Sequence, residues 1–207
     1  MTAARTVRQP RQERTREAWS RALDAGLALF REGGLDALTV SEVCRRAGMS
    51  PPSLYARVDG RVGLIAAVYE HAMEGVRASQ AEIFTDLLTR EMSSPRVRII
   101  AAVDALTRQF AVNTAVLRSM IAASVHDEWV HRRGVEEAQH VIEAVAERLA
   151  LDGEAGRDIA TMLFSELVVR TMYGSDFASP FAPDDAAFRA RLTRMALARA
   201  GASGAGE

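Results

Sequence analysis

The sequence predicts an all-α protein, and three observations lead to this prediction. Ala, Leu, Arg and Glu dominate the 207 residues, and these residue types favour helices. Apolar residues recur at helical spacing along most of the chain, and no strand-like alternation is long enough to indicate a sheet. Gly and Pro gather at a few points between these stretches. We expect an N-terminal three-helix domain at residues 1–61, a helical bundle at residues 62–200 and a disordered tail at residues 201–207.

The N-terminal domain begins with one long helix. Residues 1–9 are expected to form a mobile basic arm. The helix should run from about Pro10, which suits a first turn, to Arg31, and Gly33 and Gly34 should end it. Apolar side chains lie at helical spacing on one face of this helix. They are Trp19, Leu23, Leu27 and Phe30.

Two short helices are expected next. Thr39 and Glu42 have the spacing of a capping box, in which each side chain satisfies a free backbone N–H of the other residue. Gly48 should stop the helix that they open after Ala47. The second short helix has start and stop residues of its own, with Pro where a missing N–H costs little. These are Ser50 as the cap, Pro51 and Pro52 in the first turn, and Asp59-Gly60 at the end.

The rest of the chain predicts six further helices. Each has apolar residues at helical spacing on one side, and turn-forming residues separate them. The first of the six is long, with a bend expected at Gly75. The last two are joined by a loop that contains prolines. The expected ranges are 61–89, 95–111, 115–124, 127–150, 154–173 and 184–200, with a turn at Asp152-Gly153 and the loop at residues 174–183.

Charge is distributed unevenly along the chain. The formal net charge is −1, yet residues 1–61 carry +4 and the remainder carries −5. All 26 basic residues are Arg, which genome composition explains more simply than function does. A basic front on an acidic body fits a phosphate-binding head on a body that does not bind nucleic acid.

Several classes of protein are disfavoured. No apolar run reaches the roughly eighteen residues of a membrane-spanning helix, and the N-terminus lacks the apolar stretch of a signal peptide. Cys44 is alone, so no internal disulfide forms, and we expect a structural thiol in a cytoplasmic protein. The spacing of His126, His131 and His140 does not place them on one helical face, so we expect no metal site. No catalytic motif is found, and neither enzymatic activity nor a cofactor is expected.

The segment Thr39 to Tyr55 predicts a helix-turn-helix. Such short helices are marginal alone, and their use is geometric: the second enters the major groove of DNA while the first braces against the backbone. Tyr55 can pack on a sugar and bind a phosphate, and Arg61 in the first turn of its helix suits a phosphate as well. The arginines of the N-terminal arm could follow the duplex. The alternative is a helical hairpin with only a structural role.

The stretch Arg14–Leu64 resembles the DNA-binding domain of the TetR family of bacterial transcriptional regulators. The shared pattern runs Ala25…Leu29-Phe30-x-x-Gly33, then Leu38-Thr39-Val40-x-x-Val43-x-x-x-Ala47-Gly48-Met49-Ser50, then Ser53-Leu54-Tyr55-x-x-Val58-x-x-Arg61-x-x-Leu64. The chain departs from the family pattern at Pro51 and at Val58-Asp59-Gly60, which leaves the operator sequence open. The resemblance implies phosphate contacts at Thr39 and Tyr55, a basic residue at Arg61, and base contacts at Pro51, Pro52 and Ser53. We expect Ser50 to contact DNA as well, and also Arg57, which should point outward from the second short helix.

The resemblance also implies that the helical bundle binds a small effector and forms a homodimer. The side chains that we expect at the effector pocket are Phe110, Met120, His126, Trp129, Met162 and Phe164. Apolar stripes on two helices would build a four-helix interface across a two-fold axis. We expect Val135, Ala138, Ile142, Val145, Leu149, Leu163 and Leu167 there, although the same stripes could face the core of their own subunit.

The predicted function is that of a repressor. It would bind a palindromic operator in double-stranded DNA and leave it when a small-molecule effector binds, through a coupling free energy of about 1–3 kcal/mol. The alternatives are a helical ligand-binding protein or enzyme with a structural helix-turn-helix, and a regulator that activates or has no ligand.

Overall fold

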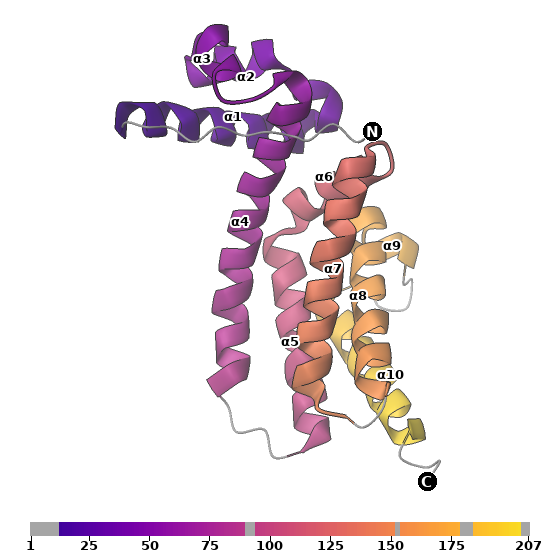
Figure 1. The fold of residues 1–207 in the computed structure, drawn as a ribbon. Coiled ribbons are helices and arrows are strands. Elements are labelled where there is room, and N and C mark those ends of the chain that lie inside the picture. The colour runs from indigo at the N-terminus through magenta and orange to yellow at the C-terminus, as the bar shows by residue number, and fades with distance from the viewer. Residues whose placement is uncertain (1–12, 90–93, 152–153, 179–183, 204–207) are drawn as a thin grey trace.

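The computed structural model describes residues 13–89, 94–151, 154–178 and 184–203, and these residues form helices joined by short connections. The expected all-α fold is confirmed (Figure 1). The helices are α1 (Glu13–Ala37), α2 (Val40–Ala47), α3 (Pro51–Tyr55), α4 (Gly60–Thr89), α5 (Pro95–Val112), α6 (Thr114–Ser124), α7 (Glu128–Leu149), α8 (Ala155–Tyr173), α9 (Ser175–Ala178) and α10 (Asp185–Ser203).

Helices α1, α2 and α3 gather at one end of the molecule, and α4 leaves this end and runs along the body (Figure 1). A first core joins the two parts. It packs buried residues of α1 to α4, such as Leu38 and Leu54, against Met120 of α6 and Val130 of α7. Since α4 belongs to both parts, its 30 residues form the continuous mechanical link between them.

The body has a second core between α5, α7, α8 and α10. Its largest fully buried side chains come from four different helices, and each is less than 2% exposed. These side chains are Leu106, Leu149, Leu163 and Leu192. Helices α8 and α10 lie on the side of the body away from α4 (Figure 1). In the described part of the chain, no helix combines the length and apolar character that crossing a bilayer requires.

The predicted breaks between helices are in place. Gly33 (φ −144°, ψ 18°) and Gly34 (φ 64°, ψ −151°) interrupt helical geometry, although α1 resumes briefly as far as Ala37. Gly48 ends α2 in the left-handed region, at φ 63°. The loop predicted at residues 174–183 contains the short helix α9, and α10 runs three residues past the predicted end. The basic arm, the turn at residues 152–153 and the tail from residue 204 on lie outside the described residues.

The prediction for the dimer interface needs a correction. Val145, Leu149, Leu163 and Leu167 are buried in the second core of their own subunit, with at most 3% of each residue exposed. Their helical stripes pack against α5 and α10 of the same chain, so no second copy can reach them. Val135, Ala138 and Ile142 keep partial exposure, and Val135 is 41% exposed.

Candidate nucleic-acid interface

Helix α2 begins with half of the expected capping box. The Thr39 side-chain oxygen accepts a hydrogen bond from the Glu42 backbone N–H at 3.2 Å. The Glu42 carboxylate does not return the contact, because it binds the guanidinium groups of Arg45 and Arg46. The hydrogen bond from Arg45 is the main reason why the pKa of Glu42 falls to about 2. Thr39 is exposed, and its cap fixes the start of α2 on the surface.

Helix α3 presents most of its side chains to solvent. Leu54 is fully buried and anchors the helix, whereas Pro51, Pro52 and Ser53 are exposed, and Tyr55 is 51% exposed. The prolines have no N–H, and the Ser53 and Leu54 N–H groups donate to the Ser50 carbonyl. The first turn of α3 therefore offers a ligand only ring carbons and the hydroxyls of Ser50 and Ser53, which lie 2.8 Å apart.

Arg57 does not face solvent, and its prediction as a DNA contact is wrong. The residue is 8% exposed. Its guanidinium donates to the carbonyls of Ser53 and Thr15, at 3.0 Å each, and lies 5.7 Å from the Trp19 ring centroid. Arg57 thus ties the end of α3 to α1. Helical spacing alone could not distinguish this position from an outward one, because the partner carbonyl of Thr15 is 42 residues away.

Arg61 stands at the start of α4 with half of its side chain exposed. Its Nη2 donates to the Leu35 carbonyl at 2.6 Å and lies 3.9 Å from Asp36 Oδ1. Its Nε lies 3.5 Å from the Leu38 carbonyl. These contacts hold the guanidinium over the turn between α1 and α2, on the surface. The neighbouring Val62 is 46% exposed.

A separate cavity of about 330 Å³ lies in the body. Three residues predicted for the effector pocket, Phe110, Met120 and Phe164, line this cavity. The others lie elsewhere: His126 is exposed, Met162 packs beside the second core, and Trp129 contacts the ring of Tyr69, with ring centroids 5.4 Å apart. Val135 and Ala138, predicted at the dimer interface, line the cavity instead.

The predicted pocket set did not include the six polar residues of the cavity wall, which are Tyr69, Gln80, Gln109, Ser124, His131 and Glu137. Burial, with the negative charge of Glu137 as the next cause, raises the pKa of Tyr69 to about 12. Helical spacing identifies such positions as inward-facing but does not show that they surround a space.

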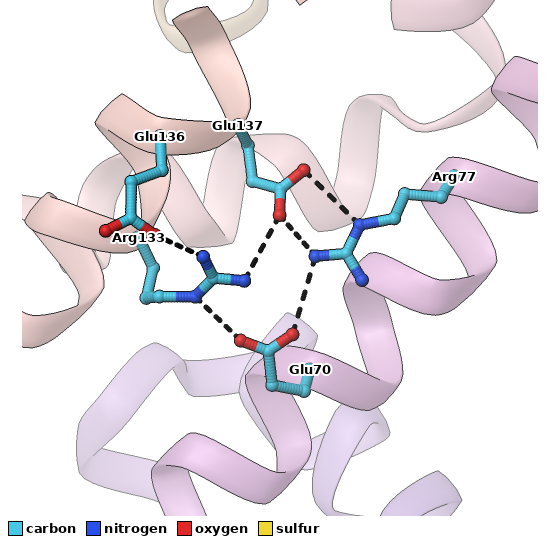
Figure 2. Close-up of polar contacts among 5 residues, drawn as sticks. All are labelled: Glu70, Arg77, Arg133, Glu136 and Glu137. Atoms are coloured by element: carbon cyan, nitrogen blue, oxygen red, sulfur yellow. Dashed lines mark hydrogen bonds and ion pairs between the residues drawn. The ribbon is translucent and has the colours of Figure 1, made fainter. Parts of the chain in front are cut away.

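An ion-pair network joins α4 to α7 beside this cavity (Figure 2). Arg77 of α4 binds Glu137, and Arg133 of α7 binds Glu70 at 2.8 Å. Figure 2 shows Arg133 and Arg77 on either side of the Glu137 carboxylate, with Glu136 on the outer side of Arg133. The network connects the helix that leaves the N-terminal end of the molecule with a helix of the cavity wall.

Comparison with known proteins supports the interpretation of the N-terminal helices. Residues 22–68 match the family model described as bacterial regulatory proteins, tetR family. The HTH-type transcriptional repressor BdcR of Escherichia coli (strain K12) is 28% identical to this chain over 111 residues. The matched region spans 54% of each of the two proteins, about half the length of this relative.

Solved structures share the whole fold. A TetR-like transcriptional regulator from Rhodococcus sp. RHA1 is similar, with a TM-score of 0.60 and 16% sequence identity, over 97% of this chain and 100% of that one. A cysteine mutant of the TetR family regulator CifR, complexed with 26bp double-strand operator DNA, has a TM-score of 0.52 and 18% identity, over 94% of this chain and 99% of that one. At these identities the likeness shows the fold.

Proposed function

The chain belongs to the TetR family of bacterial regulatory proteins through its residues 22–68, and on that premise we propose that it is a homodimeric repressor. The dimer binds a palindromic operator and dissociates from it when a small molecule binds. The observation that carries the proposal is the surface of α3. A five-residue helix with one buried anchor and four exposed side chains contributes little to a core, and its exposed face suits a groove of DNA.

The DNA contacts divide into two kinds. Thr39, Tyr55 and Arg61 carry hydroxyl or guanidinium groups at the surface, and we assign them to phosphates, which set the register of the protein on the duplex. Pro51, Pro52 and Ser53 occupy the first turn of α3, and we assign them to base edges. Since this turn presents proline rings and hydroxyl groups, we expect it to recognise bases by apolar contacts, such as a proline ring against a thymine methyl group.

A dimer would place two copies of α3 on one face of the duplex, about 34–36 Å apart, one helical turn of DNA. The stripes that face inward in this chain cannot form the interface. An apolar surface remains at the end of α8 and in α9. Val169 is 38% exposed, Tyr173 is 60% exposed and Phe177 is 70% exposed, and the rings of the last two are 4.6 Å apart. We assign the two-fold contact to the outward side of α8 and α10, with this patch at its edge.

Release from the operator requires that the effector bind one arrangement of the two DNA-binding domains more tightly than the arrangement that fits the operator. The cavity of about 330 Å³ has the size of a small-molecule site. Its wall includes Tyr69 and Met73 of α4, the helix that links the cavity to the DNA-binding end. A ligand that shifts α4 would change the position of α3. A repressor of this kind works beside the chromosome, in the cytoplasm.

Gel-shift titration against genomic fragments at two salt concentrations tests the proposal. Non-specific binding weakens steeply with salt, whereas a specific site keeps a large advantage over other fragments at both concentrations. We expect a few fragments to shift at protein concentrations at least a hundredfold lower than the rest. Uniform shifts of all fragments, or none, would refute the proposed function.

A further inference from the structure

The cavity in the body is apolar over most of its wall. Its lining residues come from α4, α5, α6, α7 and α8, and aromatic or aliphatic side chains predominate. Tyr69, Met73, Phe110, Leu117, Phe164 and Val168 are among them. The rings of Phe110 and Phe164 meet edge to face, with centroids 5.4 Å apart, which fixes one side of the space. A ligand of this cavity must therefore have a largely apolar body.

Two polar groups of the wall offer acceptor oxygens to the cavity. Gln109 is 3% exposed, and its Nε2 donates to the Val76 carbonyl at 3.0 Å. Among the described residues, Gln109 Oε1 is buried with no hydrogen-bond partner. The Ser124 hydroxyl donates to the Ile121 carbonyl at 2.7 Å, which leaves its oxygen free to accept. Such unmet acceptors cost free energy, so a ligand that donates to them gains affinity.

Glu137 is the third acceptor, and it carries charge. Its side chain is 16% exposed and lines the cavity, whereas Arg77 and Arg133, which bind its carboxylate, do not. Among the described residues, Oε2 of Glu137 accepts one hydrogen bond, from Arg77 Nε at 3.3 Å, so it retains a lone pair for a further donor. Of the described residues that line the cavity, four can also donate. Tyr69 has its phenol O–H and Gln109 the second N–H of Nε2, and the other two are Gln80, which is half-buried, and His131, which is exposed.

The charge beside the cavity favours a cation over an anion. The network of Figure 2 contains three carboxylates, those of Glu70, Glu136 and Glu137, and two guanidinium groups. The network therefore has a formal charge of −1. No arginine is among the described lining residues, and the guanidinium groups of Arg77 and Arg133 bind the Glu137 carboxylate. An anion beside Glu137 would therefore lie against a carboxylate and lose its hydration.

We propose that the cavity selects small, largely apolar molecules that carry a protonated amine, which donates to Glu137 with Gln109 as the second acceptor. This inference rests on the proposed function for its biological meaning, because it names the class of the effector. It also links the ligand to α4. An ammonium bound to Glu137 competes with Arg77 for the same carboxylate, and it thereby loosens the ion pair that holds α4 against α7.

Three probes with one carbon skeleton test the proposal on the full chain: phenylbutylamine, phenylbutanol and phenylbutyrate. Their dissociation constants are measured at neutral pH by calorimetry. We expect the amine to bind at least tenfold more tightly than the carboxylate, with the alcohol between them. Equal affinities, tighter binding of the carboxylate, or no binding by any of the three overturns the proposal.

A matched pair of variants locates the amine. Glu137→Gln keeps the size of the side chain and removes its charge, and we expect the preference for the amine over the carboxylate to fall below threefold. Glu136→Gln removes a charge from the same network at a residue that does not line the cavity, and the preference should persist. An undiminished preference in Glu137→Gln overturns the assignment.

The failure of this inference is distinguishable from the failure of the proposed function. If the chain binds specific DNA fragments but shows no preference for the amine, the ligand class is wrong and the repressor function stands. If the chain binds no specific DNA, the proposed function fails, whatever the order of the three probes.

Discussion

Arg77 of α4 lies against Glu137 of α7, with Nε 3.3 Å from Oε2 and a second contact between Nη2 and Oε1. The pair joins the helix that reaches the DNA-binding end to a wall of the cavity (Figure 2). Because Arg77 also reaches Glu70 and Arg133 also reaches Glu137, the pair is held in one geometry by its neighbours. We propose this relationship as the physical route between ligand and operator.

A double-mutant cycle on this pair measures its strength. Replacing Arg77 and Glu137 by Ala, singly and together, should give an interaction of about 1 kcal/mol in the free energy of unfolding, because the pair is only partly exposed and belongs to a network. The control is Arg108 and Asp104, which lie 3.8 Å apart with about half of each side chain exposed. The control cycle should give less than about 0.5 kcal/mol. Equal interactions in both cycles would remove the special role of the α4–α7 pair.

Arg57 and Tyr55 should separate stability from DNA binding. Arg57→Ala removes the two hydrogen bonds from a buried guanidinium to the Ser53 and Thr15 carbonyls and should lower the free energy of unfolding by about 1–3 kcal/mol. Tyr55→Ala removes an exposed side chain, so it should change stability by less than about 0.5 kcal/mol. Urea unfolding checks both values, and anisotropy titration of labelled DNA should show weaker binding for Tyr55→Ala. Unchanged DNA affinity of that variant would contradict its assignment to the phosphate backbone.

Arg61→Ala should weaken binding to every DNA sequence by a similar factor. The guanidinium is assigned to a phosphate, so its loss should lower the slope of log affinity against log salt by about one. Arg61 also donates to the Leu35 carbonyl, so titrations belong at temperatures at which unfolding curves show the variant folded. A loss of discrimination between sequences with unchanged non-specific affinity would assign Arg61 to a base.

The dimer should respond to the outward face of α8 and not to its inward stripe. Tyr173→Asp places a charge in the exposed apolar patch, and we expect a monomer of normal thermal stability in sedimentation experiments. Leu163→Ala lies in the second core and should cost about 2–5 kcal/mol of folding free energy. A stable dimer of Tyr173→Asp with unchanged affinity between subunits would exclude this patch from the interface.

Tyr69 should ionise at a higher pH than an ordinary phenol does. Burial raises its pKa from 10 to about 12, so the folded protein holds its phenolic proton more tightly than the unfolded chain does. The stabilisation linked to this proton is complete below about pH 10 and declines as the pH rises through 12. Spectrophotometric titration near 295 nm should show one late phenol, absent from Tyr69→Phe. If no phenol ionises near pH 12 and disappears in Tyr69→Phe, the buried position of Tyr69 is contradicted.

Local signals predicted the N-terminal domain well. The glycine breaks, the Thr39 cap and the prolines of α3 act through their own backbone, so neighbouring residues suffice to place them. The predicted hydrogen bond from the Thr39 backbone N–H to the Glu42 side chain was wrong, because the Glu42 carboxylate binds Arg45 and Arg46. Two guanidinium groups stabilise a carboxylate more than one backbone N–H does.

Long-range contacts account for what the sequence did not predict. An apolar stripe such as Val145 and Leu149 indicates that a helix face is buried. It does not indicate whether that face packs against the same chain or against a second copy. Arg57 looked outward because its partner in α1 is distant in sequence. The cavity needed five helices in place, so Gln109 and Glu137 could not be identified from spacing on one helix.

The most direct measurement of the central claim is the affinity of the purified chain for DNA selected from a random pool, compared with a scrambled duplex of equal length and composition at the same salt. The account predicts that selection converges on a two-fold symmetric sequence, bound at least ~10³ times more tightly than the scrambled duplex, and that Pro52→Ala erodes this ratio. Failure of the pool to converge, or equal affinity for the two duplexes, would contradict the assignment of α3 to the reading of DNA.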